Sequence, residues 1–126
     1  MYLIYVPLVL YWIVLFIATT LPGNDVPNLG VSDKIEHFAA YAVLSVLLCF
    51  TYYFQKKFRL LSSRPFLMTI LTVSVYGALD ELHQLLVPGR SCDIRDLAAD
   101  VTGALLGLLL VFVIKQFSGK MAPENN

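Results

Sequence analysis

The sequence alternates four long apolar runs with short polar segments. The first run, residues 2–21, carries no charge, and Pro22 and Gly23 end it. Three further runs lie at about residues 33–54, 65–87 and 95–117. Each run has about 20 residues or more, the length that an α-helix needs to cross ~30 Å of hydrocarbon. The pattern therefore predicts an all-α fold, an integral membrane four-helix bundle, with residues 1–126 as a single domain.

The composition supports a membrane protein and narrows the choice of partners. Hydrophobic residues make up 58% of the chain and charged residues 14%, which lies outside the usual range of soluble domains. The formal net charge is zero and the chain has no basic stripe, so no nucleic acid is expected as a partner. Membrane lipids are the expected surroundings. The sequence leaves open whether the chain forms homo-oligomers.

The charges divide unequally between the two ends of the predicted bundle. Of the nine Lys and Arg residues, six lie in the loop Gln55–Arg64 and near the C-terminus, where Glu124 is the one acid. The other end has the remaining eight acids against Lys34, Arg90 and Arg95. The positive-inside rule therefore predicts a multi-pass protein of the bacterial cytoplasmic membrane, with its N- and C-termini cytoplasmic. The acidic end then faces outward.

Polar residues recur at helical spacing at this acidic end. On a helical wheel they fall on one face of each of three predicted helices. These faces hold Asp33, Lys34, His37 and Tyr41 in the second helix, Asp80, His83 and Gln84 with Glu81 at the edge in the third, and Asp96 and Asp100 in the fourth. Ionisable groups within a membrane are costly and usually line a wet cavity. We therefore expect one shared outward-facing polar pocket. Gly103 and Gly107, below Asp100, favour close helix packing.

The residue types in this pocket suggest acid–base chemistry beneath a binding rim. Several carboxyls and an imidazole in one desolvated pocket can supply both an acid and a base. The candidate catalytic residues are Asp80, Glu81, His37 and Asp100, and the candidate substrate-binding residues are Asp33, Lys34, Tyr41, Gln84, Arg90 and Asp96. Arg90 suits bidentate contact with a phosphate or carboxylate. No nucleophile motif or phosphate loop is present, so the reaction class, and whether the protein is an enzyme, stay open.

No cofactor is expected, and the metal prediction is also none. His37 and His83 with nearby acids offer the ligand types of a catalytic zinc, but the chain has no H-E-x-x-H spacing. His37 is expected to hydrogen-bond Asp80 or Asp33. His83 is expected to be an interfacial or packing histidine.

Three ordered blocks of sequence resemble the VanZ-like family of small membrane proteins. They are D-K-I-E-H-F-A-A-Y at 33–41, D-E-L-H-Q at 80–84, and P-G-R-S-C-D-I-R-D-L-A-A-D-V-T-G-A-L-L-G at 88–107. The family pattern reads D-K-x-x-H-F-x-x-Y, then D-E-x-x-Q, then P-G-R followed by D-x-x-x-N-x-x-G-x-x-x-G. Every candidate site residue named above matches a polar position of this pattern, although Asp100 stands where many members have Asn.

The resemblance implies membership of a group named for a determinant of resistance to the glycopeptide teicoplanin. The expected function is binding of, or action on, a cell-envelope lipid, a lipid-linked cell-wall precursor or a glycopeptide, with a contribution to antibiotic resistance. The alternative is a non-catalytic structural or interaction protein, whose charged residues only lock helix packing. Proton-coupled transport is less favoured, because the chain shows no internal repeat.

Overall fold

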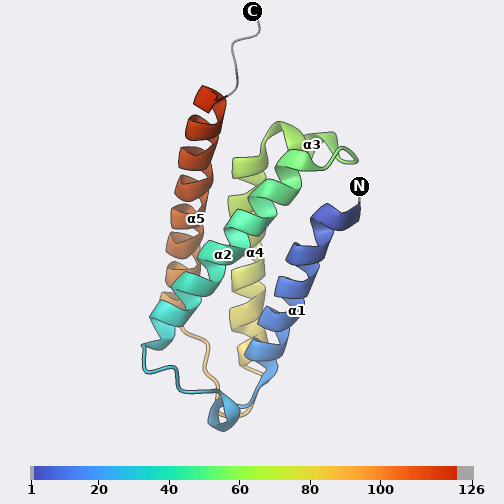
Figure 1. Cartoon of the computed structure of the whole chain (residues 1–126). Coiled ribbons are helices and arrows are strands. Elements are labelled where there is room, and N and C mark those ends of the chain that lie inside the picture. The colour runs from blue at the N-terminus through green and yellow to red at the C-terminus, as the bar shows by residue number, and fades with distance from the viewer. Residues whose placement is uncertain (1, 122–126) are drawn as a thin grey trace, which may run out of the picture.

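The computed structural model describes residues 2–121, which form an all-α bundle (Figure 1). Its elements in chain order are η1 (Tyr2–Tyr5), α1 (Val6–Thr20), η2 (Gly23–Asp25), α2 (Asp33–Phe54), α3 (Arg59–Ser63), α4 (Pro65–Gln84) and α5 (Ile94–Met121). Four segments are long and apolar enough to cross a membrane, at residues 2–20, 33–54, 65–84 and 94–119. The predicted four-helix membrane bundle is confirmed.

Two helix boundaries differ from the predicted ones. The third predicted helix extends to residue 87, whereas α4 ends at Gln84 and the chain continues in tight turns. In these turns Val87 N–H donates to the Gln84 carbonyl at 3.1 Å, which leads the chain into Pro88 and into Gly89 with its positive φ of 74°. The last helix continues beyond the predicted residue 117 to Met121, because a single glycine, Gly119, does not end a long helix.

The structure places α2 against α5 through small residues. A Cβ added at Gly103 would overlap the Phe38 carbonyl, and one at Gly107 would overlap the Ser45 hydroxyl and the Ala42 carbonyl. The glycines therefore let the two backbones approach closely, as the sequence pattern predicts. This contact fixes which face of α5 meets α2.

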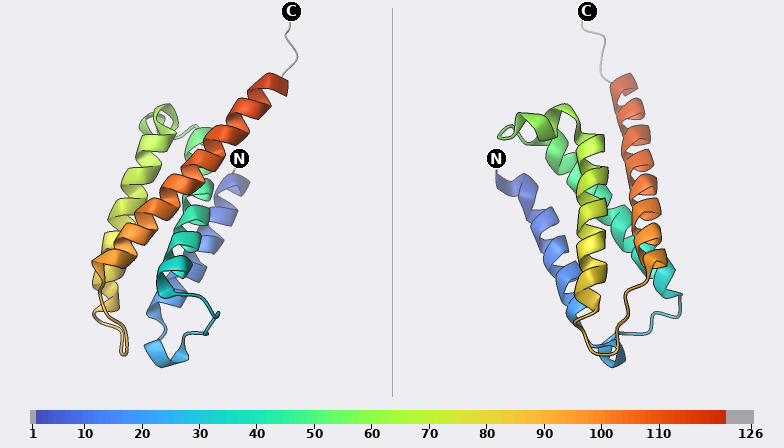
Figure 2. Two further views of the ribbon diagram at one scale, coloured as in Figure 1. Left: turned by 90° about the vertical axis from the view of Figure 1, so that its left-hand side faces the viewer. Right: turned by 180° about the vertical axis from the view of Figure 1, so that it is seen from behind.

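Both termini and α3 lie at one end of the bundle, and the loops 21–32 and 85–93 lie at the other (Figures 1 and 2). These two loops are tied together. Gly23 N–H donates to the Pro88 carbonyl at 2.9 Å. The Arg90 guanidinium donates from Nε to the Leu21 carbonyl at 3.2 Å and from Nη2 to the Ala18 carbonyl at 2.9 Å. Arg90 thus satisfies carbonyls at the C-terminal end of α1, where a cation is also favoured by the helix dipole.

The core lies around α2, and α1 is attached at its side. Leu44, Leu48 and Val73 are fully buried, whereas α1 buries only Leu8 and Leu15 and exposes most of its apolar side chains. Large apolar side chains also cover the outer face of α5. An apolar exterior of this kind suits a surface that faces lipid rather than water.

Candidate functional site

The three predicted polar faces meet at the end of the bundle opposite the termini. His37 of α2 and Asp100 of α5 form a buried pair, with 2.7 Å between Nδ1 and Oδ1. Because an ionised carboxylate can only accept, the imidazole Nδ1–H donates in this hydrogen bond. Glu81 of α4 completes the group: one donor atom each from His37, Glu81 and Asp100 lies within 4.8 Å of the others. All three side chains are buried.

Asp80 lies deeper and has a different partner from the predicted one. Tyr41 Oη donates to Asp80 Oδ2 at 3.1 Å. Of the two partners predicted for His37, Asp80 is therefore wrong, and Asp33 lies 3.9 Å from the ring, within ion-pair distance but too far for a hydrogen bond. The helical wheel gives the direction of a side chain but not the neighbour that it meets. Gly103 and Gly107 bring α5 directly onto α2, so His37 meets Asp100. Gly77 of α4 leaves room for this carboxylate, since a Cβ there would lie 3.0 Å from Asp100 Oδ2.

An outer layer of charges covers this buried group. Lys34 Nζ lies 2.9 Å from Asp93 Oδ2 and 2.9 Å from Asp96 Oδ1. Asp93 also donates its backbone N–H to Glu81 Oε2 at 2.9 Å. The Arg95 backbone N–H and the Lys34 ammonium lower the pKa of the Asp93 carboxyl. Asp93 therefore stays ionised, and it links the loop before α5 to Lys34 of α2 and Glu81 of α4. The sequence analysis did not include Asp93 among the candidate site residues.

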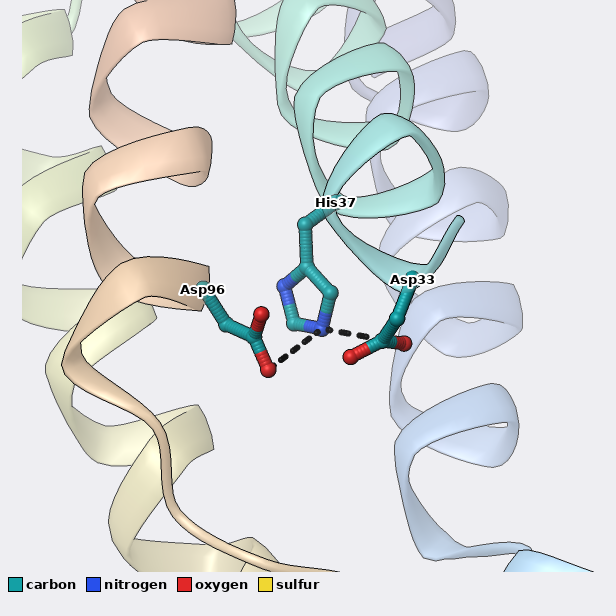
Figure 3. A group of neighbouring side chains, drawn as sticks. All are labelled: Asp33, His37 and Asp96. Atoms are coloured by element: carbon teal, nitrogen blue, oxygen red, sulfur yellow. Dashed lines mark ion pairs between the residues drawn. The ribbon is translucent and has the colours of Figure 1, made fainter. Parts of the chain in front are cut away.

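The second ring nitrogen of His37 faces two more carboxylates, as Figure 3 shows. Nε2 lies 3.9 Å from Asp33 Oδ1 and 3.8 Å from Asp96 Oδ2. Asp96 is almost fully buried, whereas half of the Asp33 side chain is exposed. His37 Nε2 thus lies between one carboxylate inside the bundle, Asp96, and one at its outer edge, Asp33.

A cavity of about 120 Å³ opens beside His37, between α1, α2, α4 and the Arg90 loop. Its lining residues are Leu15, Ala18, Thr19, Val26, Asp33, Glu36, His37, Ala40, Tyr41, Gln84 and Arg90. Glu36, one turn from Asp33 on the same helix, is a lining residue that the sequence analysis missed, because it stands at an unconstrained position of the family pattern.

The predicted site residues therefore divide into two groups. Among the candidate substrate-binding residues, Asp33, Tyr41, Gln84 and Arg90 line the cavity, and Lys34 and Asp96 form an ion pair beside it. Of the four candidate catalytic residues, His37 alone lines the cavity. Asp80, Glu81 and Asp100 are buried behind the lining. The group best placed for chemistry on a cavity ligand is the His37 imidazole.

His83 takes no part in this cluster. Its Nε2 lies 3.3 Å from Thr20 Oγ1, and its ring lies 5.6 Å from the Phe16 ring, centroid to centroid. Both partners belong to α1, so His83 packs between helices as predicted. A larger, mostly apolar depression of about 540 Å³ lies at the opposite end, where Lys115 is its one charged lining residue among the side chains that the structure describes.

Comparisons with known proteins identify the family of the chain. The model of the VanZ/LLP1 family matches residues 2–115, almost the whole chain, so the protein belongs to this family. Comparison with curated proteins and with solved structures gives no significant match.

Proposed function

We propose that this VanZ/LLP1 membrane protein binds the polar head group of an envelope lipid or lipid-linked cell-wall precursor in its outer cavity, and thereby contributes to glycopeptide resistance. The observation that supports this proposal most is a cavity with charged and polar side chains in its lining, at the end of an otherwise apolar bundle. Helices α1 and α4, which contribute to the cavity lining, also carry exposed apolar side chains such as Phe16 and Leu82. A lipid could keep its chains against these side chains while its head group enters the cavity.

The size of the cavity favours a head group over a whole antibiotic. At ~30 Å³ for each water, 120 Å³ corresponds to about four waters, enough for one phosphate-sized group. Pockets that enclose a drug-sized molecule usually have ~300–1,000 Å³. A glycopeptide is larger still, so it fits the rim but not the cavity.

Arg90 is the group in the lining that suits a phosphate or carboxylate. A guanidinium has five N–H donors, and the two α1 carbonyls use two of them. The remaining donors can serve an anionic ligand in the cavity that Arg90 lines. The orientation in the proposal follows the positive-inside rule, which puts the Arg90 end outside the cytoplasm of a bacterial cell.

Binding can be tested on the purified full-length protein by native mass spectrometry with phosphatidylglycerol and with an uncharged diacylglycerol. The wild type should retain the phosphate-bearing lipid, and Arg90→Gln should retain at least fivefold less. Arg95→Gln is the matched control, because Arg95 belongs to the same end of the chain but is exposed and outside the cavity lining. Equal retention by Arg90→Gln and Arg95→Gln would contradict head-group binding.

The resistance part of the proposal needs a cellular test. A glycopeptide-sensitive bacterium expressing the wild type should tolerate more teicoplanin than the empty strain, and Arg90→Gln should lose that gain at equal membrane abundance. Unchanged susceptibility with the wild type would refute a role in resistance while leaving head-group binding to the direct assay.

The alternative, a purely structural role for the charges, also has an observation in its favour. The charged and polar side chains of the cluster already have partners within the protein. Lys34 pairs with Asp93 and Asp96, His37 hydrogen-bonds Asp100, and Tyr41 hydrogen-bonds Asp80. If these pairs only lock the helices together, each variant should lose resistance in proportion to its loss of thermal stability. A variant such as Asp80→Asn that remains folded but inactive would contradict the structural alternative.

A further inference from the structure

We infer that Asp33, His37 and Asp96 bind a divalent transition-metal cation of the Zn²⁺ or Mn²⁺ type at the edge of the cavity. This inference goes beyond the proposed lipid binding and does not depend on it. It also departs from the sequence-based expectation of no metal, which rested on the lack of a local motif. The three residues come from two helices, α2 and α5, so no local spacing could reveal them.

The distances suit a shared ion better than direct hydrogen bonds. His37 Nε2 lies 3.9 Å from Asp33 Oδ1 and 3.8 Å from Asp96 Oδ2, beyond the ~3.2 Å limit of a good hydrogen bond. Ligand atoms at ~2.1 Å from one metal lie about 3.4 Å apart in a tetrahedron and about 4.2 Å apart when opposite. The three donor atoms all lie within 4.8 Å of one another, so a small side-chain shift completes the site.

Asp100 prepares the imidazole for a cation. Its Oδ1 accepts the Nδ1–H of His37 at 2.7 Å, so Nδ1 carries a proton, and the neutral form of the ring has its lone pair on Nε2. Nε2 faces the carboxylates of Asp33 and Asp96 (Figure 3), so a lone pair on this nitrogen is repelled by them unless a cation lies between. A metal-bound histidine typically donates its other N–H to a carboxylate in this way. Asp100 is thus the positioning residue of the site.

Buried oxygens without hydrogen bonds supply independent support. Within the described part of the chain, Glu81 Oε1, Asp96 Oδ1 and Asp100 Oδ2 are buried and accept no hydrogen bond. Asp96 Oδ1 has the Lys34 ammonium at 2.9 Å, but the other two oxygens lack even an ion pair. Four carboxylates therefore gather around one imidazole, at Asp33, Glu81, Asp96 and Asp100. Because the carboxylates outnumber the Lys34 ammonium and the His37 imidazole that pair with them, a dication would stabilise this group.

The donor set indicates the type of ion. An imidazole nitrogen with two carboxylate oxygens suits Zn²⁺ or Mn²⁺, whereas Mg²⁺ and Ca²⁺ prefer oxygen ligands throughout. Three protein ligands leave a coordination position open for water or a ligand atom. Asp33 and His37 both line the cavity, so that position faces the space where a head group would enter.

The test is a Zn²⁺ titration of the purified full-length protein in detergent against a chromophoric chelator, without added lipid. Cys92→Ser serves as the background, because the exposed Cys92 thiol at the same end could bind zinc by itself. One equivalent should bind, and Asp33→Asn should weaken the affinity at least tenfold. Asp33 is half exposed, so this variant should keep the fold. Asp25→Asn removes an acid from the same end but outside the cluster and should bind as the background does.

Cobalt provides a second readout that does not depend on affinity alone. Co²⁺ bound to the background protein should show visible absorption bands typical of nitrogen and oxygen ligands, and His37→Asn should abolish them. Failure of the background protein to bind zinc would overturn the inference, as would equal affinity in Asp33→Asn and Asp25→Asn. In that case the positive charge between the carboxylates is the proton of an imidazolium. A lipid that still binds to metal-free protein would show that the proposed function stands without the ion.

Discussion

The two ends of this bundle use charge in different ways. At the Arg90 end, Lys34 and Asp96 form an ion pair, His37 and Asp100 form another when the imidazole is protonated, and all the ion pairs found among the side chains of residues 2–119 lie there. At the end with the termini, Lys56 and Lys57 are exposed and form none. The exposed lysines of the terminal end are the charges from which the positive-inside rule predicts the orientation of the chain. At the Arg90 end several charged groups are buried, and Asp96 and Asp100 of α5 pair with side chains of α2.

The largest loss of folding stability is expected for a substitution at Asp100. Replacing it with Ala removes the partner of buried His37, and breaking a buried pair in this way typically costs ~3–5 kcal/mol. Lys115→Ala at the other end removes a cation over the Tyr53 ring, 4.0 Å from its centroid, and should cost ~1 kcal/mol or less. Equilibrium unfolding in detergent compares the two variants. Equal losses would show that the Arg90 end is no more dependent on its charges than the terminal end.

Helix packing should show the same contrast along α5. Gly107→Val inserts a side chain into the contact with Ala42 and Ser45 and should cost ~1–3 kcal/mol or more, with poor yield of folded protein. Gly119, near the end of the same helix, has open space around it. Gly119→Ala should therefore be neutral or raise stability by up to ~1 kcal/mol through helix propensity. A tolerated Gly107→Val would mean that α2 and α5 do not approach as closely as the structure shows.

The Tyr41 hydroxyl gives a finer test of the buried network. Tyr41→Phe leaves Asp80 Oδ2 without its 3.1 Å hydrogen bond and should lower stability by ~1–3 kcal/mol. Tyr53→Phe at the terminal end changes a half-exposed ring and should lie within ~0.5 kcal/mol of the wild type. The melting temperatures of the two variants in the same detergent test this difference in stability. An unchanged melting temperature in Tyr41→Phe would mean that Asp80 accepts a hydrogen bond from another donor.

The smallest expected effect is a pH dependence at Asp93, outside the membrane-spanning segments. Its pKa is lowered in the fold by the Arg95 backbone N–H and by Lys34, so its ionised form stabilises the folded state. A lowered pKa contributes stability above the unfolded value of ~3.9, and the contribution disappears as pH falls through the lower folded value. Unfolding curves from pH ~6 to ~2 should therefore fall less steeply for Asp93→Asn than for the wild type. Parallel curves would refute this contribution.

The sequence predicted the helices and the polar faces better than the contacts between them. Four apolar runs led to four membrane helices, because hydrophobic length is a property of each segment alone. The glycines at 103 and 107 correctly predicted a close contact of α5. The partner of His37 was misassigned, because a helical wheel cannot say whether Asp80 of α4 or Asp100 of α5 lies opposite. The turn at Gln84 was also missed, since the apolar run Leu85–Val87 continues the helical pattern without a break.

By itself, the sequence determined the class of fold, the presence of four membrane helices, the unequal charge of the two ends and the residues that gather at one of them. Only the tertiary structure decided that Asp100 pairs with His37, that Asp80 pairs with Tyr41, and that Arg90 turns two donors toward α1. It also separated the residues that line the cavity from those buried behind them. The physical reason is that apolar length and helical periodicity act within one segment. Ion pairs and cavities depend on how separate helices pack, and here a pair of glycines sets that packing.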